Sequence, residues 1–470
     1  MNSRQPSAPP SSSPQAAGNA SGSAHAPAGL ARQLGLVSFT ALVIGEVIAV
    51  GIFLTPAGMA KSLGSPLWLL AVWLAMGAMA LAGALCYGEL AARFPQAGGG
   101  YVYLKRAFGP AVAFLYGWKC LLVMDPGITA ALAVGLTSYV GYLTALSPWS
   151  MKLLAVGVVA ALAAANILGL RIGAGLIRWL TALKLGALLA IIVTALALRA
   201  GDWNHFLPLL EQRPGSDPLM AALAGALVGA FFAFGGWWEV AKMAGEAQNP
   251  GRTVPRALAL GVVIVTLVYI LTSAVFLYLV PMEQVTSGET FAAQAGEALF
   301  GSAGGQVLAL IVILSVAGSL ATLLMALPRV YYAMARDGVF FRGIGAVHPR
   351  FGTPARASAL QAGLATLLIL AGNFEQIISY FIFVTVAFVG LTGAGVFVLR
   401  RRERRRPSFR VPGYPWVPLF FLVLVAMLLV LLAVQRPLQA GLGVGVMALG
   451  APVYYLIFRR RPAGHGRPAP

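Results

Sequence analysis

Charge is scarce in this sequence, and acidic side chains are the scarcest. Only 10% of the 470 residues are charged, and Asp and Glu together number 14, against 33 Lys and Arg. Soluble domains carry roughly a quarter charged residues, whereas 59% of this chain is hydrophobic. The composition therefore excludes an ordinary soluble protein and indicates one that lies mostly within a membrane.

Residues that build disulfides, metal sites and catalytic centres are also few. The two cysteines, Cys86 and Cys120, lie in apolar segments, so no disulfide framework is expected. The four histidines fall in expected tails or loops without metal-ligand spacing, and the sequence has no phosphate-binding Walker A run. No loop between the apolar segments is long enough for a catalytic domain. We therefore expect no enzyme activity, no cofactor and no metal.

Apolar segments dominate what the sequence does contain. A spanning helix needs about 20 mostly apolar residues, and 12 windows of this kind predict an all-α membrane protein with 12 transmembrane helices. The windows are 34–59, 66–93, 111–141, 150–170, 175–199, 218–245, 255–280, 305–336, 355–372, 375–400, 416–434 and 437–458.

Both ends of the chain differ from these windows. Residues 1–30 are rich in Ser, Pro, Ala and Gly and lack the apolar core of about 7–15 residues that a signal peptide needs. We expect this segment to be a disordered tail. Residues 461–470 are expected to form a second, shorter tail.

The basic residues indicate which side each loop faces. If the N-terminus is cytoplasmic and each helix crosses once, 25 of the 33 basic residues fall on the cytoplasmic side and five on the opposite side. The other three, Lys119, Lys184 and Lys242, lie at membrane depth. This asymmetry follows the positive-inside rule. We therefore expect cytoplasmic termini, contact with lipid and no nucleic-acid partner, although the net charge is +19.

Glycine clusters interrupt two expected helices near their middles. The first helix contains Gly45 and Gly51, and the sixth contains the pair Gly235–Gly236. Glycines weaken helices, and an unwound stretch at membrane depth is tolerated only where it lines a cavity or is buried in protein. Close helix packing would be another use for these glycines. Their matching positions five helices apart favour a binding site.

Two unwound stretches in one cavity would suit a zwitterion. Free N–H groups at the start of a half-helix attract a carboxylate, and free carbonyls at the end of another attract an ammonium group. Glycine-interrupted helices at matching positions are typical of transporters with inverted repeats. This predicts a 5+5 inverted repeat over residues 31–200 and 201–402, with two additional helices in 403–460.

A series of motifs runs in order along residues 34 to about 415. It comprises VIAVGIFLTP (47–56), YGELAARFPQAGGGYVYL (87–104), FFAFGGW (231–237), GEAQNPGRTVPRA (245–257), RVYYAMARDG (329–338) and HPRFGTP (348–354). In these motifs the sequence resembles the amino acid–polyamine–organocation superfamily, and within it the L-type amino acid transporters. The resemblance implies the leucine-transporter-like inverted-repeat fold, with alternating access around a central site.

The resemblance also implies that backbone groups at the two interrupted helices bind an amino acid substrate. The matched residues are Val47, Ala49, Val50 and Gly51 for the carboxylate, and Phe232, Ala233, Phe234 and Gly235 for the amine. Phe232 matches the aromatic gate over the substrate. The family's usual G-x-G is A-V-G here, which adds bulk beside the carboxylate site.

Three ionisable residues near the interruptions are candidates for coupling or substrate binding, because a charge at membrane depth costs roughly 2.5–3.5 kcal/mol on insertion scales. The resemblance implies that the ammonium of Lys184 takes the place of a sodium ion, either as a proton carrier or as a fixed cation. The alternative is that the Lys184 side chain only snorkels towards the cytoplasmic end of its helix. Glu46 would meet a cationic group, carry a proton or stay protonated between helices. Glu239 would pair with Lys242, three residues on, or contact substrate.

Other polar and aromatic residues are assigned structural roles. Glu89, Arg93 and Tyr101 flank the loop between the second and third helices and are expected to form a cytoplasmic gate and loop structure. Of the adjacent Trp237 and Trp238, one is expected to shape the pocket and the other to face lipid.

The resulting hypothesis is sodium-independent secondary active transport of amino acids, as an exchanger or proton symporter. Transport of a polyamine or another organic cation is an alternative, suggested by Glu46 and Glu239. A non-transporting amino acid sensor is the alternative of another class. The Ala- and Arg-rich composition suggests a bacterial inner membrane. Family members that bind a heavy-chain partner have a cysteine in the loop between the third and fourth helices. The corresponding segment here, Tyr142–Ser150, contains none, so no disulfide-linked heavy-chain subunit is expected.

Overall fold

The computed structural model describes residues 34–48, 51–96, 98–168, 174–284, 291–341, 343–344, 346, 348–351, 353–403 and 406–458. The chain divides into two compact units, Met1–Ala31 and Arg32–Pro470. The first unit lies outside the described residues, as do the expected tails 1–30 and 461–470. The fold given below is that of the second unit.

The described residues are mostly helical and contain no strand; one isolated β-bridge joins Leu34 and Ala247. The α-helices are α1 (Leu36–Val47), α2 (Gly51–Leu63), α3 (Pro66–Arg93), α4 (Gly100–Phe108), α5 (Pro110–Lys119), α6 (Asp125–Leu143), α7 (Pro148–Ile167), α8 (Ala174–Ala197), α9 (Leu219–Ala233), α10 (Trp237–Val240), α11 (Pro250–Leu279), α12 (Phe291–Ala326), α13 (Pro328–Arg336), α14 (Ala355–Ala371), α15 (Phe374–Arg402), α16 (Trp416–Gln435) and α17 (Pro437–Val453). Short π- or 3-10 turns are η1 (Cys120–Met124), η2 (Trp203–Phe206), η3 (Ala241–Glu246), η4 (Met282–Gln284) and η5 (Tyr454–Phe458).

Every predicted window contains helix. In the described part of the chain, nine helices are long and apolar enough to cross a membrane, and the bent pair α1–α2 makes a tenth. Two shorter apolar helices, Ala182–Ala197 and Ala355–Ala371, occupy the fifth and ninth windows. The prediction of an integral, all-helical membrane protein is therefore confirmed.

Two regions differ from the predicted windows. Residues 100–108 were expected to be loop but form α4, a short helix with one buried face, which is too short to register in a search for spans. The eighth window, 305–336, is divided between α12 and α13, and α12 begins earlier, at Phe291. Gly301 bends this start with a φ of 69°, a conformation that glycine adopts without steric cost.

Proline and serine mark several helix starts. Proline occupies the first helical position of α3, α5, α7, α11 and α17, where its missing N–H has no intrahelical partner to lose. Ser65 and Ser147 accept hydrogen bonds from backbone N–H groups in the first turns of α3 and α7. These local signals explain why the predicted starts at 66 and 437 agree with the structure.

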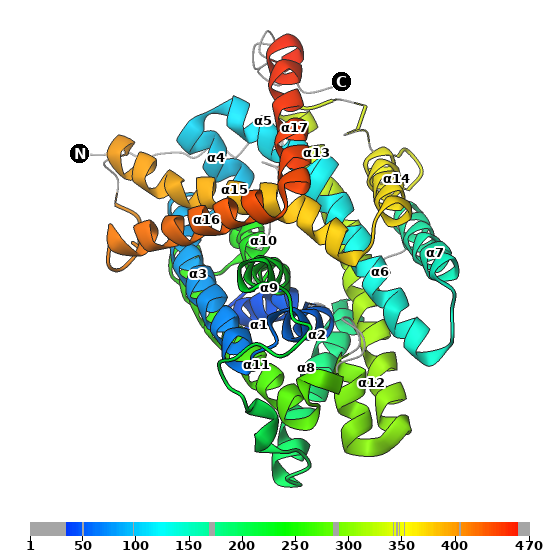
Figure 1. The fold of residues 1–470 in the computed structure, drawn as a ribbon. Helices are drawn as coiled ribbons and strands as arrows, with labels where there is room; N and C mark the ends of the chain where they lie inside the picture. Colours follow the sequence, from blue (N-terminus) through cyan, green and yellow to red (C-terminus); the bar gives the residue numbers. More distant parts are fainter. Residues whose placement is uncertain are drawn as a thin grey trace, which may run out of the picture. The chain divides into compact units, whose positions relative to one another are not determined.

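The interrupted helices are enclosed by longer ones (Figure 1). Helix α1 packs against α11, α2 packs against α9 and α12, and α9 also contacts α3, α15 and α16. The α3–α11 pair is close, since a Cβ on Gly77 would lie 2.4 Å from Thr266 Cγ2. Long, buried helices therefore hold the two interruptions in place.

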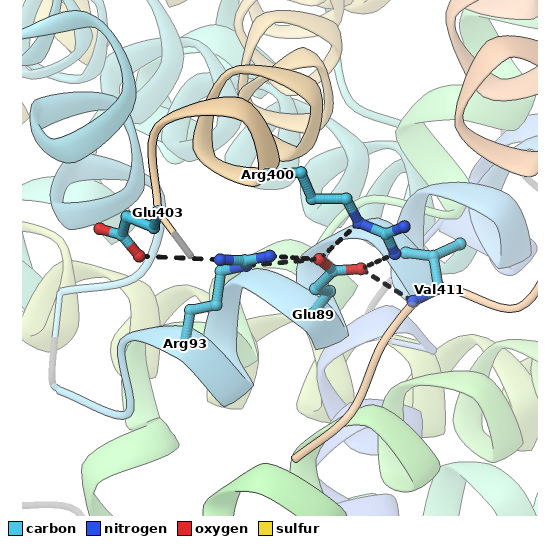
Figure 2. Close-up of polar contacts among 5 residues, drawn as sticks. All are labelled: Glu89, Arg93, Arg400, Glu403 and Val411. Carbon is cyan, nitrogen blue, oxygen red and sulfur yellow. Dashed lines mark hydrogen bonds and ion pairs between the residues drawn. The ribbon is translucent and has the colours of Figure 1, made fainter. Parts of the chain in front are cut away.

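A buried network joins helix ends at one end of the bundle, which we call the arginine-rich end (Arg93, Lys105, Arg400 and Arg402). Figure 2 shows the fully buried carboxylate of Glu89 on α3 at its centre. Glu89 accepts hydrogen bonds from Arg93 Nη2 at 3.1 Å, from Arg400 Nε at 2.8 Å and from the Val411 backbone N–H at 2.8 Å. The network thus ties α3 to α15 and to the segment before α16.

Replacing Glu89 with glutamine is expected to destabilise the protein by about 3–5 kcal/mol, because removing one partner of a buried ion pair leaves the other charge uncompensated. The side chains of Arg93 and Arg400 are only 4% and 9% exposed. Thermal unfolding of the purified protein in detergent measures the effect. Glu375→Gln is the matched control, because Glu375 is exposed on α15 and has no ion pair within the described ranges. Equal unfolding midpoints for the two variants would contradict this account.

Two further contacts close the arginine-rich end. The Tyr101 hydroxyl donates a hydrogen bond to Asp337 Oδ2 at 2.9 Å, and Lys105 Nζ lies 3.1 Å from the same oxygen. These contacts connect α4 to the end of α13. Tyr101, like Glu89 and Arg93, thus lies in contacts between helix ends, although it belongs to α4 and not to the expected loop.

The other end of the bundle is closed by the loop between α8 and α9. Arg213, only 8% exposed, forms an ion pair with Glu283 and donates hydrogen bonds to the backbone carbonyls of Gly64, His205 and Leu207 at 2.9–3.2 Å. Burial raises the pKa of the Glu283 carboxyl, whereas its backbone hydrogen bond and the neighbouring Arg213 lower it. The lowering influences together outweigh burial, so this pKa lies below its usual range. The loop is thereby fastened to the α2–α3 turn and to η4.

Candidate substrate site

Two helix interruptions meet inside the bundle. Helix α1 ends at Val47 and α2 begins at Gly51, with the two axes bent by 45°. Helix α9 ends at Ala233, and α10 begins at Trp237 after the Phe234–Gly236 turn. Both interruptions fall at the glycine clusters in the sequence. Of the predicted binding residues, Ala49 and Val50 lie outside the described residues.

The two interruptions are in direct backbone contact. A Cβ on Gly51 would lie 2.1 Å from the Cα of Ala233, so only glycine fits there at this separation. A Cβ on Gly236 would lie 2.9 Å from Cγ of Glu46, and Gly236 has a φ of +114°, which disfavours other residues. The first and sixth helices therefore approach each other at glycine positions on both sides of the interruptions.

The carbonyls at the end of α1 have identifiable partners. Ile44 O accepts the Ile48 N–H at 2.8 Å, as in a regular helix. Gly45 O accepts a hydrogen bond from Lys184 Nζ at 3.1 Å. Lys184 comes from α8 and is 3% exposed. Because the C-terminal end of a helix carries partial negative charge, an ammonium group there is favourable. Lys184 thus caps the interrupted first helix.

Tyr269 on α11 connects the two interruptions. Its hydroxyl lies 2.9 Å from Val47 O and 2.8 Å from Ala233 O, and the side chain is fully buried. A hydroxyl has one proton to donate, so it can bond only one of the two carbonyls at a time. The other carbonyl is left as an acceptor at the meeting point of the helices.

Aromatic rings cover the sixth-helix interruption. Phe232 is 9% exposed, and its ring centre lies 5.6 Å from that of Phe374 and 6.2 Å from that of Phe381, both on α15. Phe234 packs instead against Tyr269, with ring centres 5.2 Å apart. Gly235 donates its N–H to Phe232 O at 3.0 Å. Phe232 thus connects the end of α9 to α15 through ring contacts.

The acidic candidates lie on the arginine-rich side of the interruptions. Glu46 is half-buried and interacts electrostatically with Glu239, Lys184 and Lys242. Glu239 forms an ion pair with Lys242, three residues further along. This pairing agrees with the ion-pair interpretation of Glu239 and leaves its other carboxylate oxygen, Oε1, buried without a partner among the described residues.

A second buried polar group lies on the third predicted helix, at the π-turn η1. The Asp125 carboxylate accepts a hydrogen bond from the Tyr331 hydroxyl of α13. Lys119 is 1% exposed, and its Nζ lies 4.9 Å from the Tyr116 ring centre and 3.0 Å from Met124 Sδ. Asp125 thus contacts the neighbouring helix α13, and Lys119 contacts residues of its own predicted helix.

The structure corrects one sequence interpretation and adds one residue. Trp237 and Trp238 are 2% and 6% exposed, so neither faces lipid. They are buried because α10 is a short helix that packs against α1, α3 and α11. Tyr269 was missed, since a single tyrosine in an apolar window gives no local signal of contact with two distant carbonyls.

The arrangement can bind both ends of an amino acid. A helix that begins at Gly51 leaves its first N–H groups without intrahelical partners, and such groups suit a carboxylate. The carbonyls of Val47 and Ala233 share one hydroxyl proton and suit an ammonium group. Within the described ranges, no group of three or more His, Cys, Asp or Glu side chains is placed to hold a metal ion.

Comparison with known proteins agrees with this geometry. Residues 34–458 match the family described as amino acid permease. The chain is 32% identical to the serine/threonine exchanger SteT of Bacillus subtilis (strain 168), over 92% of this chain and 98% of that protein. It is 28% identical to the human cystine/glutamate transporter, over 92% and 87% of the two chains. It is 29% identical to the human large neutral amino acids transporter small subunit 2, over 91% and 80%.

Proposed function

This chain belongs to the amino acid permease family and transports amino acids, and we propose that it does so by sodium-independent alternating access, as an exchanger or proton symporter. The contact between the two helix interruptions carries the proposal. Backbone donors of α2 and backbone acceptors of α1 and α9 converge where Gly51 meets Ala233. A substrate bound there would be held by groups common to all amino acids, and its side chain would decide specificity.

The proposed binding residues are Val47, Ala49, Val50 and Gly51 for the carboxylate, and Phe232, Ala233, Phe234 and Gly235 for the amine side. Tyr269 is added to this set because its hydroxyl contacts carbonyls at both interruptions. Phe232 would cover the substrate from the side of α15.

Sodium independence rests on Lys184. Its ammonium is buried and hydrogen-bonded to a carbonyl at the end of α1, where a bound cation would otherwise balance the negative end of the helix. A fixed lysine supplies that charge without an ion from solution. Glu46, in the same electrostatic network, is the partner through which a proton would be exchanged if transport is coupled to protons.

The proposed topology has 12 spans, with the 5+5 inverted repeat in residues 31–402 and two further helices in 403–460. The membrane would be a bacterial inner membrane, and both termini would lie on its cytoplasmic side. The clustering of Arg93, Lys105, Arg400 and Arg402 at one end of the bundle supports this orientation, because cytoplasmic loops carry the excess of basic residues.

We propose small neutral amino acids as substrates. The site is tightly packed, with backbone in contact at Gly51 and Ala233 and with bulky neighbours from α15. SteT is a serine/threonine exchanger, and serine and threonine belong to this size class. The protein is further proposed to work without a disulfide-linked partner, since Cys86 and Cys120 are free and buried.

Uptake by the purified protein in sodium-free liposomes tests the proposal. We expect radiolabelled serine or threonine to accumulate and unlabelled neutral amino acids to compete, with putrescine ineffective. Stimulation by internal amino acid indicates exchange, whereas stimulation by an acid-outside gradient indicates proton symport. A strict requirement for sodium would refute the role of Lys184, and competition by putrescine alone would instead support the organic-cation alternative.

A further inference from the structure

A cavity of about 240 Å³ lies at the arginine-rich end, beside the start of α11. It is lined by Leu36, Asn249, Arg252, Thr253 and Arg256. Leu36 is about three helical turns before the interruption at Val47, so the cavity is distinct from the substrate site. It is smaller than drug-sized ligand pockets, which measure about 300–1,000 Å³, and suits a compact group.

Positive charge at this cavity is not balanced by acidic side chains. Arg252 and Arg256 are four residues apart, so both lie on the same face of α11. Both are exposed, and neither has an ion pair or side-chain hydrogen bond in the part of the chain that the structure describes. By contrast, Arg93, Arg213 and Arg400 all have carboxylate partners.

A mostly buried threonine offers its hydroxyl to the cavity. Thr253 is 8% exposed and lines the cavity between the two arginines. Its hydroxyl has no hydrogen-bond partner among the described residues and is not fully enclosed, so it is accessible from the cavity. A ligand oxygen within the cavity would give this hydroxyl a partner.

The start of α11 adds to the positive charge at the cavity. Pro250 and Asn249 begin this 30-residue helix, and the Asn249 side chain makes no capping hydrogen bond. The N–H groups of Arg252 and Thr253 already bond to Asn249 O, at 2.9 and 2.8 Å, so this terminus contributes mainly the positive end of the helix dipole. Two guanidinium groups, a hydroxyl and a helix N-terminus together form a donor set that favours phosphate.

The cavity also adjoins the first turn of α1. Leu34 donates its N–H to Glu246 O at 3.0 Å and accepts the Gln248 N–H at 3.0 Å, so the start of α1 is paired with the segment that leads into α11. A group bound between Leu36 and Arg252 would contact both helices. It would therefore strengthen the attachment of α1, the helix that contains the first interruption.

We propose that this cavity binds a phosphoryl group, presented by an anionic lipid headgroup or by soluble phosphate, and thereby fastens the start of α1 to α11. The positive-inside rule explains arginines on this face of the bundle. It does not explain why two of them line one cavity together with the unbonded hydroxyl of a mostly buried threonine. The site is independent of the residues proposed to bind the transported amino acid.

Native mass spectrometry of the delipidated full-length protein tests the proposal. The probes are dioleoyl phosphatidylglycerol, dioleoylglycerol, which lacks the phosphate, and inorganic phosphate. We expect one phosphatidylglycerol to bind in preference to dioleoylglycerol. We expect Arg252→Gln/Arg256→Gln to weaken this binding about tenfold or more, since each basic residue adds to the attraction of anionic lipid. Binding of inorganic phosphate without phosphatidylglycerol would assign the same site to a soluble ligand.

The matched control is Arg401→Gln/Arg410→Gln, which removes two exposed arginines near the same end without touching the cavity. Thr253→Val keeps the charge, removes only the hydroxyl and is expected to weaken binding as well, so it gives a second test should the double variant misfold. Equal losses in the cavity variants and the control, equal binding of dioleoylglycerol, or no binding of either phosphate probe would overturn the proposal. Because binding is measured without transport, these outcomes are separate from those of the uptake assay.

Discussion

Replacing Lys184 with alanine is expected to reduce amino acid uptake about tenfold or more while the protein still inserts and folds. The Lys184 ammonium donates a hydrogen bond to Gly45 O, next to the first-helix interruption, and no solvent is available to replace it because the residue is 3% exposed. A hydrogen bond to a charged group contributes about 1.5–3 kcal/mol, and 1.4 kcal/mol corresponds to a factor of ten. Initial uptake rates in proteoliposomes with equal protein content measure the loss.

Lys152→Ala is the control for this variant. Lys152 also donates a hydrogen bond to a backbone carbonyl, that of Leu370 at 2.8 Å, but it lies at the start of α7 with its side chain near Trp149. Uptake by the Lys152 variant should match the unmodified protein. Full activity of Lys184→Ala would show that the ammonium is dispensable and would remove the basis for its role in place of sodium.

Gly51→Val is expected to abolish most transport and to destabilise the protein by about 1–3 kcal/mol, the usual cost of overpacking. A Cβ at this position would lie 2.1 Å from Cα and 3.0 Å from N of Ala233, which are backbone atoms and cannot rotate away as a side chain can. The two interruptions would have to separate, and the carbonyls of Val47 and Ala233 could no longer share the Tyr269 hydroxyl. Uptake and thermal unfolding of the purified variant measure the two effects.

Gly58→Val separates this steric effect from the lower helix propensity of valine. Gly58 lies on the same helix, and a Cβ there would have no atom within 4 Å. The Gly58 variant should retain most uptake. If Gly51→Val transported as well as Gly58→Val, the close contact between α2 and α9 would not be required for function.

Each end of the bundle is held together by one charged side chain that contacts several segments. At the arginine-rich end, Glu89 receives hydrogen bonds from two arginines and one backbone amide. At the opposite end, Arg213 binds Glu283 and three backbone carbonyls. Each network has one central charge that contacts several segments, so a single charge change would release all of them together. Alternating access requires that such closures open one at a time.

Local features of the sequence were sufficient for the membrane fold. Apolar windows coincide with every candidate span among the described residues, because burial in lipid depends on the length and hydropathy of a continuous stretch. Glycine clusters located both interruptions, because glycine weakens a helix wherever it stands. Helix α4 was missed, since a helix of nine residues with one buried face has no such signature.

The candidate site was predictable only in part. The glycine cluster and the charge at membrane depth pointed to Gly51 and Lys184, whereas Val47 and Phe232 were implied by the family resemblance. Tyr269 was not predicted, since nothing in its neighbourhood distinguishes it from a tyrosine that packs in the core. Its importance comes from contacts with carbonyls 222 and 36 residues away along the chain.

The sequence by itself therefore determined that this chain spans a membrane as helices, where two of those helices are interrupted, and which buried lysine lies near them. Only the tertiary structure decided that Gly51 meets Ala233, that Tyr269 joins the two interruptions, that Glu89 binds Arg400, and that Thr253 faces a basic cavity. The physical reason is that hydropathy and helix propensity act over one or two turns of chain. Contacts between helices depend instead on which surfaces pack together, and no local pattern encodes that choice.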